Sequence, residues 1–404
     1  MLETRPLCSG ATGRNGGHIK PDCYKSFNQL QDRYGPDMAL QLSDVVELVE
    51  TRAVGLYMTE NAWKEASGSF DACLAHLKTQ DLAQWTARMQ RMNKFAQLDA
   101  QKNVEESNEL TSLLEQSFRF SNTYGVISYP ACTLWAYKLA AGIIDKVIDA
   151  GLRVSAHTPA LKISPVGDGP EWLVKTSRGS IKCRRIFHAT NGYVSSLLPE
   201  LAGKVVPTKG HVVVLQPSPK YAAEPLDHSA GVQWGEDFDY MIQRPSDGNL
   251  LIYGGRDLAH PHGFGAIVGD ADDRSLTRPI IEALQDFPAR YMNGWERGKS
   301  EIRYAWSSIM GFTQYMIPLV GAVPSRQGKF LAAGYSGHGM VRSFLTVKAL
   351  LQSAFNEPID PRVPGMYLDI EGRLEWRDAC WEELLKASRT FREDSRVLPP
   401  RQKI

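Results

Sequence analysis

The sequence predicts a protein of the α/β (α+β) class, in which a domain of strands and helices is joined to a second, mostly antiparallel β-sheet domain. Three observations predict this class. A strand, a glycine turn and an apolar-periodic helix follow one another over residues 328–352. Two strand-rich zones, 152–187 and 205–255, are separate in the sequence, and the glycine-poor stretch 36–118 has helical periodicity. Such patterns are typical of layered folds, in which helices pack on a sheet and bury the apolar side chains of both.

The first part of the chain is predicted to be mainly helical. Over residues 36–118, apolar residues recur at helical spacing in two sets. The sets are Met38, Leu42, Val45, Val46, Val49 and Val54, and then Leu74, Leu77, Leu82, Trp85, Met89 and Met92. A further helix is predicted to start at Tyr129-Pro130 and to stop at Gly151, where glycine provides a C-terminal cap.

After residue 151 the pattern becomes strand-like, with glycine and proline turns between the strands. The predicted strands are 152–156, 172–176, 180–187, 210–215, 239–244, 249–253, 301–306 and 328–333. The turn 245–248 between two of them has hairpin chemistry. Helices are predicted over 276–292, after Gly339, and in the tail around Trp376 and Trp381.

Composition and charge exclude several classes of protein. The chain has 404 residues, 43% hydrophobic and 23% charged, which is enough for two domains with real cores. A net charge of +1 gives no basic surface for nucleic acid or an anionic membrane, and no apolar run is long enough to span a bilayer. Six scattered cysteines without a C-x-x-C pair argue against a metal site and fit a reducing, cytoplasmic setting.

Four glycine-bearing segments are the candidates for chemistry. Ser9–Gly17 offers backbone N–H groups and the charge of Arg14 to a phosphate or a flat ring, and a flexible surface loop is an equal alternative. The second segment, 189–192, follows a strand, and the third, 306–311 with 318–321, lies at strand ends. For these two, plain turns are the simpler explanation when each is taken alone. The fourth segment, 334–340, opens a helix whose dipole and backbone donors favour negative charge.

Together these segments resemble FAD-dependent oxidoreductases of the D-amino-acid oxidase type. The matching segments occur in the same order as in that family: Ser9–Gly17, His157–Ile163, Ala189–Tyr193, Ile309–Thr313 with Pro318–Gly321, and Gly334–Met340. The first loop is especially similar to a fungal and bacterial branch that reads A-T-G-R-N-G-G-H. The resemblance covers nearly the whole chain. It implies a Rossmann-like domain that binds FAD, and hydride transfer from a C–N bond of an amine or amino acid to flavin N5, with oxygen or another acceptor reoxidising the flavin.

The resemblance also implies a role for each matching residue. Glu3 would accept hydrogen bonds from the adenosine ribose, and the backbone of Ala160 and Leu161 would face the adenine. The pyrophosphate and the flavin edge would be lined by Ser9, Ala11, Thr12, Arg14, Asn15, Gly16 and Gly17, and closed over by Thr190, Asn191 and Gly192. The isoalloxazine ring would lie against Gly337, His338, Gly339 and Met340.

Arg244, His338 and Tyr253 are the candidate catalytic residues. Arg244 matches a position where the family often carries arginine, and it would pair with a substrate carboxylate in a bidentate way. Arg256 and Arg303 are rivals, and a structural ion pair is the alternative for all three arginines. An aromatic wall, or alternatively ordinary core packing, is expected for Tyr240, Tyr253, Trp306 and Tyr315.

The start of the chain departs from the family pattern. In a Rossmann half, the ribose-binding acid follows the G-x-G-x-x-G turn by about 20 residues, whereas only two residues precede Glu3. The missing strand, turn and helix would leave a gap beside the second strand. Three explanations are open: a truncated gene prediction, which we favour; a natural short form that binds FAD weakly; or a flavin-free binding protein without redox chemistry. Tyr315 also stands where the family commonly carries an acid.

These patterns divide the chain into four predicted parts. The FAD-binding domain is discontinuous and lacks its N-terminal βα unit; it comprises residues 1–35, 120–204 and 328–360. A helical insertion spans 36–119, a substrate domain 205–327 and a helical tail 361–404. The expected partner is a small amine or amino acid, and the oligomeric state is left open.

Overall fold

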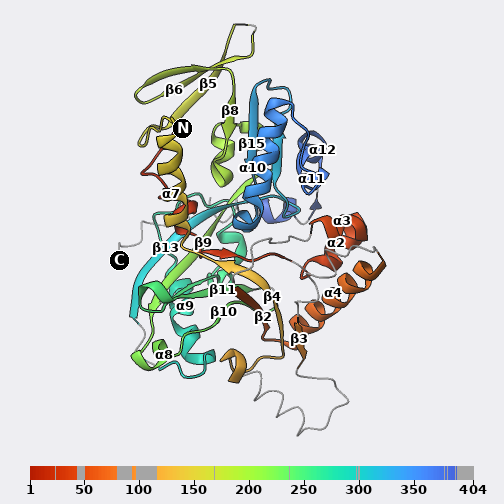
Figure 1. The fold of residues 1–404 in the computed structure, drawn as a ribbon, viewed down its shortest axis with the longest axis vertical. Helices are drawn as coiled ribbons and strands as arrows, with labels where there is room; N and C mark the ends of the chain where they lie inside the picture. Colours follow the sequence, from red (N-terminus) through yellow and green to blue (C-terminus); the bar gives the residue numbers. More distant parts are fainter. Residues whose placement is uncertain are drawn as a thin grey trace.

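The computed structural model of the chain describes residues 1–22, 24–42, 51–79, 93–96, 116–167, 169–235, 237–296, 298, 301–376, 378, 379, 381–386 and 388. A large curved sheet fills the middle and lower part of Figure 1, and a smaller body of helices and short strands stands above it. The mixed α/β class predicted from the sequence is confirmed.

The large sheet has the strand order β1-β4-β2-β10-β11-β12-β9-β13, with β3 paired to β4. Its strands are β1 (His18–Ile19), β2 (Thr51–Tyr57), β3 (Asn93–Ala96), β4 (Gly125–Thr133), β9 (Val206–Gln216), β10 (His228–Gln233), β11 (Phe238–Arg244), β12 (Leu250–Gly254) and β13 (Glu301–Phe312). Among its described ladders only β2–β10 is parallel, so the sheet is mostly antiparallel as predicted. β1 and β4 join this sheet although their residues were assigned to the FAD-binding part.

The helical prediction for 36–119 is wrong in part. α3 (Pro36–Leu42) and α4 (Glu60–Thr79) are helices, but β2 and β3 are strands. Val54 on β2 faces one core and Ala53 the other. A strand buried on both faces does not alternate in polarity, so its apolar residues can match helical spacing by chance. Outside the described residues lie Val45, Val46, Val49, Leu82, Trp85, Met89 and Met92.

The helix predicted from Tyr129-Pro130 is misplaced. Both residues lie in β4, and the helix α7 (Ala136–Asp149) begins after that strand. Proline is common at helix starts but also occurs in strands near an edge, so the sequence signature was ambiguous. The predicted stop is confirmed, because Gly151 follows the helix with a φ of +102°.

The smaller body contains two three-stranded sheets. One consists of β5 (Ala160–Val166), β6 (Glu171–Thr176) and β7 (Gly179–Cys183), and the other has the order β14-β15-β8. Its strands are β14 (Leu319–Ala322), β15 (Lys329–Ala333) and β8 (Ile186–His188), and α10 (Gly339–Phe355) packs on β14 and β15. The predicted strand 180–187 is therefore two strands, and 152–156 is reduced to one bridge between Leu2 and Ser155.

The remaining elements agree with the sequence. The hairpin β11–β12 turns at Pro245–Asp247, and Gly248 adopts a left-handed conformation. The predicted helices correspond to α9 (Arg278–Tyr291) and α10, and the tail contains α11 (Gly365–Leu368) and α12 (Ile370–Glu375). Short helices precede or interrupt the large sheet: α1 (Ala11–Arg14), α2 (Phe27–Tyr34) and α8 (Pro219–Ala223).

The two faces of the large sheet bury different cores. On one face, Met241 and Tyr253 pack with Phe287 of α9. On the other face, β2 and β4 pack against α2 and α4 at one end, and Ile242 and Trp306 belong to a smaller cluster at the other end. The N-terminal loop lies on this second face, where Gly16 meets Tyr240, so this face positions the candidate site.

Candidate functional site

Strand β13 is the element on which the four glycine segments meet. Nε1 of Trp306 donates a hydrogen bond to the carbonyl oxygen of Arg14 (2.6 Å). Further along the strand, the carbonyl oxygen of Gly311 accepts a hydrogen bond from the backbone N–H of Ser336 (2.8 Å). A Cβ added to Gly311 would lie 2.8 Å from the backbone nitrogen of Gly192. The first, second and fourth segments therefore all touch the third.

The glycines of the N-terminal loop hold it against the large sheet. A Cβ added to Gly16 would lie 2.7 Å from the ring of Tyr240. Gly17 has a φ of +77°, and a Cβ there would lie 2.1 Å from the carbonyl oxygen of Leu134. The carbonyl oxygen of Gly17 in turn accepts a hydrogen bond from the backbone N–H of Leu134 (2.9 Å). Both positions require glycine, so this loop is packed and is not a loose surface turn.

Arg14 anchors the loop through its own contacts. Its Nε donates to the carbonyl oxygen of Ser9 (2.7 Å), and its Nη1 donates to the carbonyl oxygens of Asp273 (2.8 Å) and Ser307 (2.9 Å). The buried carboxylate of Asp273 also pairs with Arg5 (2.7 Å). The guanidinium of Arg14 is therefore engaged within the protein, and the resemblance-based role at the pyrophosphate stays a prediction.

The other polar side chains of the N-terminal loop differ in whether they have a hydrogen-bond partner. Oδ1 of Asn15 accepts a hydrogen bond from the backbone N–H of Gly17 (2.9 Å), which shapes the turn. Ala11 and Thr12 are exposed. The hydroxyl oxygen of Ser9 is buried and has no hydrogen-bond partner among the described residues. A buried orphan of this kind is explained by a polar ligand atom or water beside it.

The residues assigned to the adenosine side lie close together. The backbone N–H of Glu3 donates to the carbonyl oxygen of Ser155 (3.0 Å), and the carbonyl oxygen of Glu3 accepts from the N–H of Thr158 (2.8 Å). These bonds place Glu3 beside the chain that enters β5 at Ala160. Leu161 is 57% exposed there, so its surroundings leave room for a ligand.

Asn191 joins the second segment to the fourth. Its Oδ1 accepts a hydrogen bond from the backbone N–H of Gly334 (2.9 Å), and its φ is +44°. Asparagine adopts this left-handed conformation more readily than most residues. Thr190 beside it is exposed, whereas Gly192 is buried. The structure therefore brings the predicted closing segment directly onto the turn that leads to α10.

The fourth segment presents the N-terminus of a long helix. α10 spans 17 residues from Gly339, with His338 as its N-cap residue. Gly337 is exposed with a φ of +84°, and Met340 is half-buried. α10 contacts β1, which continues directly from the N-terminal loop. α10 is thus close to the strand that follows the loop, and the positive end of its dipole would favour a ring that becomes anionic on reduction.

Tyr253 is not part of this site. Its ring is fully buried in the core that packs on α9, and its hydroxyl donates a hydrogen bond to Oδ2 of Asp239 (2.7 Å). Alternation along β12 sends Tyr253 to the face opposite Gly16 and Tyr240. Arg256 binds the same carboxylate through its backbone N–H (2.8 Å). Core packing, the alternative considered for Tyr253, thus describes its surroundings, and Arg256 lies against Asp239.

Arg244 lies on the expected face, but its charge is already matched. Its guanidinium forms an ion pair with Asp247 and stacks on the ring of Trp135, 4.1 Å from the centroid. The alternative of a structural ion pair thus describes Arg244. Of its rivals, Arg303 is largely exposed beside Glu301.

The remaining aromatic candidates do not all lie on the face of the large sheet that carries the candidate site. Tyr240 and Trp306 lie on the site face, whereas Tyr315 packs edge-on to Trp376 with ring centroids 4.7 Å apart. The aromatic wall therefore consists of two of its four predicted members. His18 on β1 and Lys20 directly after that strand reach the same face, against Tyr240 and Gly231; neither was among the predicted site residues, although both follow the glycine run closely.

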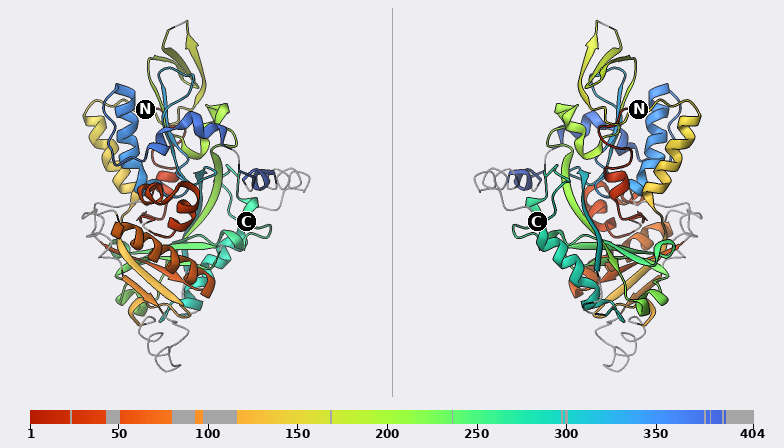
Figure 2. Two further views of the ribbon diagram at one scale, coloured as in Figure 1. Left: turned by 90° about the vertical axis from the view of Figure 1, so that its right-hand side faces the viewer. Right: turned by 90° about the vertical axis from the view of Figure 1, so that its left-hand side faces the viewer.

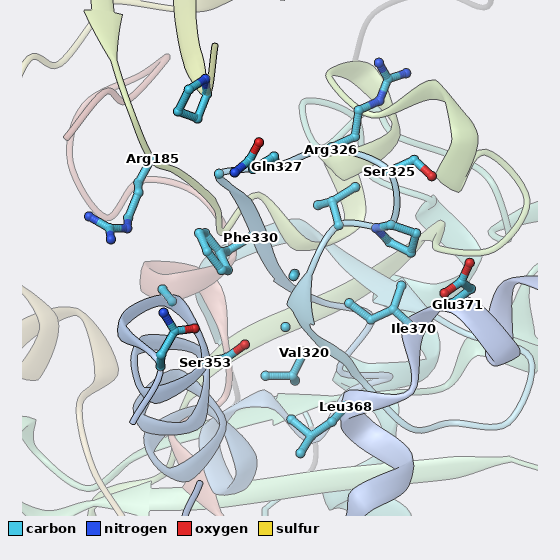
Figure 3. Close-up of a pocket in the computed structure, with 18 of the residues that line it drawn as sticks. Arg185, Val320, Ser325, Arg326, Gln327, Phe330, Ser353, Leu368, Ile370 and Glu371 are labelled. Carbon is cyan, nitrogen blue, oxygen red and sulfur yellow. The ribbon is translucent and has the colours of Figure 1, made fainter. Parts of the chain in front are cut away.

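Of two pockets in the described part of the structure, one borders the candidate site. One of about 480 Å³ is lined by Arg14, Asp273 and Trp306, and it borders the N-terminal loop. A larger one of about 1130 Å³ lies between the turn that joins β14 to β15 and the end of α10 (Figure 3). Arg326 and Glu371 line this larger pocket, and none of the predicted cofactor-binding residues does. The larger pocket is therefore separate from the candidate cofactor site.

β8 is an edge strand, and two helices nearby expose apolar side chains. Among the described residues, β8 pairs on one edge only, with β15, and Leu2 bridges Ser155 instead of β8. α7 and α10 lie on the same side of the molecule (Figure 2). Both expose apolar side chains, namely Tyr137, Leu139, Ile143, Val147, Ile148, Phe344, Val347, Leu351 and Phe355.

Two kinds of feature are absent from the described ranges. No helix there is long and apolar enough to cross a membrane. No group of three or more His, Cys, Asp or Glu side chains there could hold a metal ion. Cys8 and Cys183 are free thiols.

A buried orphan hydroxyl at Ser9 and a helix N-terminus at Gly339 fit an anionic dinucleotide cofactor. With a helix-covered parallel strand pair on one side and a large antiparallel sheet on the other, they define an FAD-dependent oxidoreductase. The chain belongs to the family described as FAD dependent oxidoreductase, whose model matches residues 1–352.

Individual proteins show the same relationship. The chain is 25% identical over 351 residues to the "Probable oxidoreductase OrdL" of Rhizobium meliloti (strain 1021), covering 84% of this chain and 73% of that protein. It is 23% identical over 367 residues to the "Gamma-glutamylputrescine oxidoreductase" of Escherichia coli (strain K12), covering 87% and 76%. Its fold is similar to that of glycine oxidase from Geobacillus kaustophilus, with a TM-score of 0.65, 17% identity, and 92% and 91% of the two chains covered.

Proposed function

We propose that the chain binds FAD between the N-terminal loop and the start of α10 and oxidises a C–N bond of an amine or amino acid. The observation that supports this most is the convergence of four separate glycine segments on β13. Bound FAD supplies the two-electron acceptor for the hydride that leaves the substrate carbon. Glycine and γ-glutamylputrescine, named for the similar proteins, are the first substrates to test.

In this proposal the side chains and backbone of the protein bind the FAD and orient it. Glu3 holds the ribose, the backbone of the N-terminal loop lines the flavin edge, and the α10 N-terminus stabilises negative charge on the ring. His338 caps α10 and lies where the ring would end. Tyr240 and Trp306 wall the site on the sheet side and exclude water from it.

Gly339→Val tests the position of the flavin. The nearest described atom to an added Cβ is Cβ of Tyr335 at 3.6 Å, an ordinary contact, so the fold tolerates the substitution. A branched side chain at the helix start would nevertheless fill the space proposed for the ring. We therefore expect the variant to keep its thermal unfolding midpoint and to lose FAD retention, measured by flavin absorbance after gel filtration.

The control is Gly265→Ala, since no described atom lies within 4 Å of an added Cβ there. Equal flavin content in Gly339→Val and the control would remove α10 from the site.

A flavin-free binding protein is the second candidate function, and the unpaired edge of β8 favours it. The two candidates differ in one experiment. The chain, and a version carrying an added upstream strand–G-x-G-x-x-G–helix unit, are purified and incubated with FAD. We expect flavin to copurify with at least the extended form; a fully folded, colourless extended form would support the flavin-free alternative and contradict the proposal.

A further inference from the structure

A loop without helix or strand, residues 270–276, lies against both the large sheet and the N-terminal part of the chain; we call it the strap. On the side of the sheet, Nζ of Lys209 on β9 donates to Oγ of Ser275 (2.7 Å) and to the carboxylate of Asp270 (3.3 Å). The hydroxyl of Ser307 on β13 donates to the carbonyl oxygen of Ser275 (2.9 Å). One side of the strap is therefore fastened to β9 and β13.

The other side of the strap holds two segments of the predicted cofactor site. The carboxylate of Asp273 pairs with Nη1 of Arg5 (2.7 Å) and lies 3.4 Å from Nη1 of Arg14. The carbonyl oxygen of Asp273 accepts a hydrogen bond from the same Nη1 of Arg14 (2.8 Å). The carbonyl oxygen of Ala271 accepts one from the hydroxyl of Tyr193, which directly follows the second glycine segment (3.2 Å). The strap therefore ties both segments to the large sheet.

Asp273 supplies the negative charge in this arrangement. Its side chain is 7% exposed, and those of Arg5 and Arg14 are 33% and 28% exposed. Among the described residues, no other carboxylate forms an ion pair with either arginine. Water screens such a pairing less than it screens a pair on the open surface. Loss of the carboxylate would leave two partly buried guanidinium groups without a counter-charge.

The contacts of Arg14 carry this restraint into the backbone of the N-terminal loop. Its Nε donates to the carbonyl oxygen of Ser9 (2.7 Å), and its own carbonyl oxygen accepts a hydrogen bond from Nε1 of Trp306 (2.6 Å). The buried hydroxyl of Ser9, which has no partner among the described residues, lies at the other end of the same stretch. Asp273 therefore holds the side chain on which the shape of the loop from Ser9 to Arg14 depends.

We propose that Asp273 is a positioning residue for the cofactor: through Arg5 and Arg14 it holds the N-terminal loop in the form that binds FAD. This inference rests on the proposed function and specifies what keeps that site in shape. Asp273 itself touches neither flavin nor substrate. Without its charge, the strap stays attached to β9 and β13, but the N-terminal loop is no longer tied to the strap, so FAD dissociates more readily.

The indole of Trp306 reports on the position of the loop without any cofactor. The full chain is labelled with fluorotryptophan, and the Trp306 signal is assigned in the fluorine NMR spectrum from the Trp306→Phe variant. In Asp273→Asn, the hydrogen bond from this indole to the carbonyl oxygen of Arg14 should loosen. We expect the Trp306 signal to shift while the signals of distant tryptophans stay in place. A general loss of structure would move all of them, so the two causes are separable.

Retention of FAD is the second measurement. We expect Asp273→Asn to raise the dissociation constant of FAD about tenfold or more, followed by flavin fluorescence in the reconstituted chain. The control Asp272→Asn changes the neighbouring acid, which pairs with the exposed Arg274 (2.7 Å), and should alter neither the Trp306 signal nor FAD binding. Arg5→Lys keeps the charge opposite Asp273 and should preserve most of the affinity, whereas Arg5→Met should weaken it as Asp273→Asn does.

Two results would overturn the positioning role of Asp273. One is an unshifted Trp306 signal in Asp273→Asn, and the other is a shifted signal with unchanged FAD affinity. Both could stand beside amine oxidation by a chain that binds FAD. A wild-type chain that binds no FAD would contradict the proposed function itself, and the fluorine spectrum would still show whether Asp273 holds the loop.

Discussion

Replacing Gly311 by alanine is expected to lower the free energy of unfolding by about 3 kcal/mol and to abolish flavin retention. The added Cβ would lie 2.6 Å from Oδ1 of Asn191 and 2.8 Å from the backbone nitrogen of Gly192. Neither neighbour can yield, because Oδ1 of Asn191 is bonded to Gly334 and Gly192 is pressed against the carbonyl oxygen of Met310. Chemical denaturation and flavin content measure the two effects.

Gly142→Ala is the matched control for this change. Gly142 lies inside α7, and no described atom lies within 4 Å of an added Cβ. The same substitution should therefore raise the free energy of unfolding by about 0.5–1 kcal/mol, because alanine favours helix more than glycine does. If Gly311→Ala were as stable as Gly142→Ala, the glycine segments would not meet on β13 as described.

Asp239→Ala is expected to lower the free energy of unfolding by about 3–5 kcal/mol. The fully buried carboxylate accepts hydrogen bonds from Nε1 of Trp234 (2.9 Å), the hydroxyl of Tyr253 (2.7 Å) and the backbone N–H of Arg256 (2.8 Å). Alanine would leave all three donors without an acceptor inside the protein. Asp286→Ala is the control: it removes an exposed helical pair with Arg290 and should cost less than about 0.5 kcal/mol.

The same carboxylate gives a pH-dependent signature. Burial raises the pKa of Asp239 from 3.8 to about 6. The folded protein therefore holds this proton more tightly than the unfolded chain does. The stability contributed by Asp239 is fully present below pH 3.8 and is lost as the pH rises through about 6. The total loss is about 2–3 kcal/mol.

Asp239→Asn cannot titrate, so the difference in unfolding free energy between wild type and variant isolates this effect from other groups. We expect the advantage of the wild type over Asp239→Asn to shrink between pH 4 and pH 6 and then to level off. A difference that stays constant over this range would show that Asp239 keeps an ordinary pKa when folded.

Local patterns in the sequence predicted much of the fold. The turn after Arg244 and the start of α10 were predictable because glycine, proline and apolar spacing fix them within a few residues. β2 was not predictable. A central strand buried on both faces does not alternate between apolar and polar residues, and its partner β10 lies far away in the sequence.

The candidate site was also predictable only in part. The glycine segments were found because each is a short motif, and the structure brings them together on β13. The loss of Tyr253 follows from the register of β12, which sets the face on which each side chain lies. The surroundings of Lys20 were not predictable, because only folding places Gly231 and Phe238 beside it. Glycine within a strand is itself a sign of close approach, but it does not say what approaches.

Anaerobic mixing of the FAD-loaded protein with amines tests the central claim most directly. Glycine, γ-glutamylputrescine and a panel of amino acids would be added without oxygen while the visible flavin absorbance is followed. We predict that at least one of them bleaches the oxidised flavin and that Gly339→Val shows no such bleaching. A protein that holds FAD tightly but stays fully oxidised with every amine, while other reductants bleach it, would contradict C–N oxidation as its reaction.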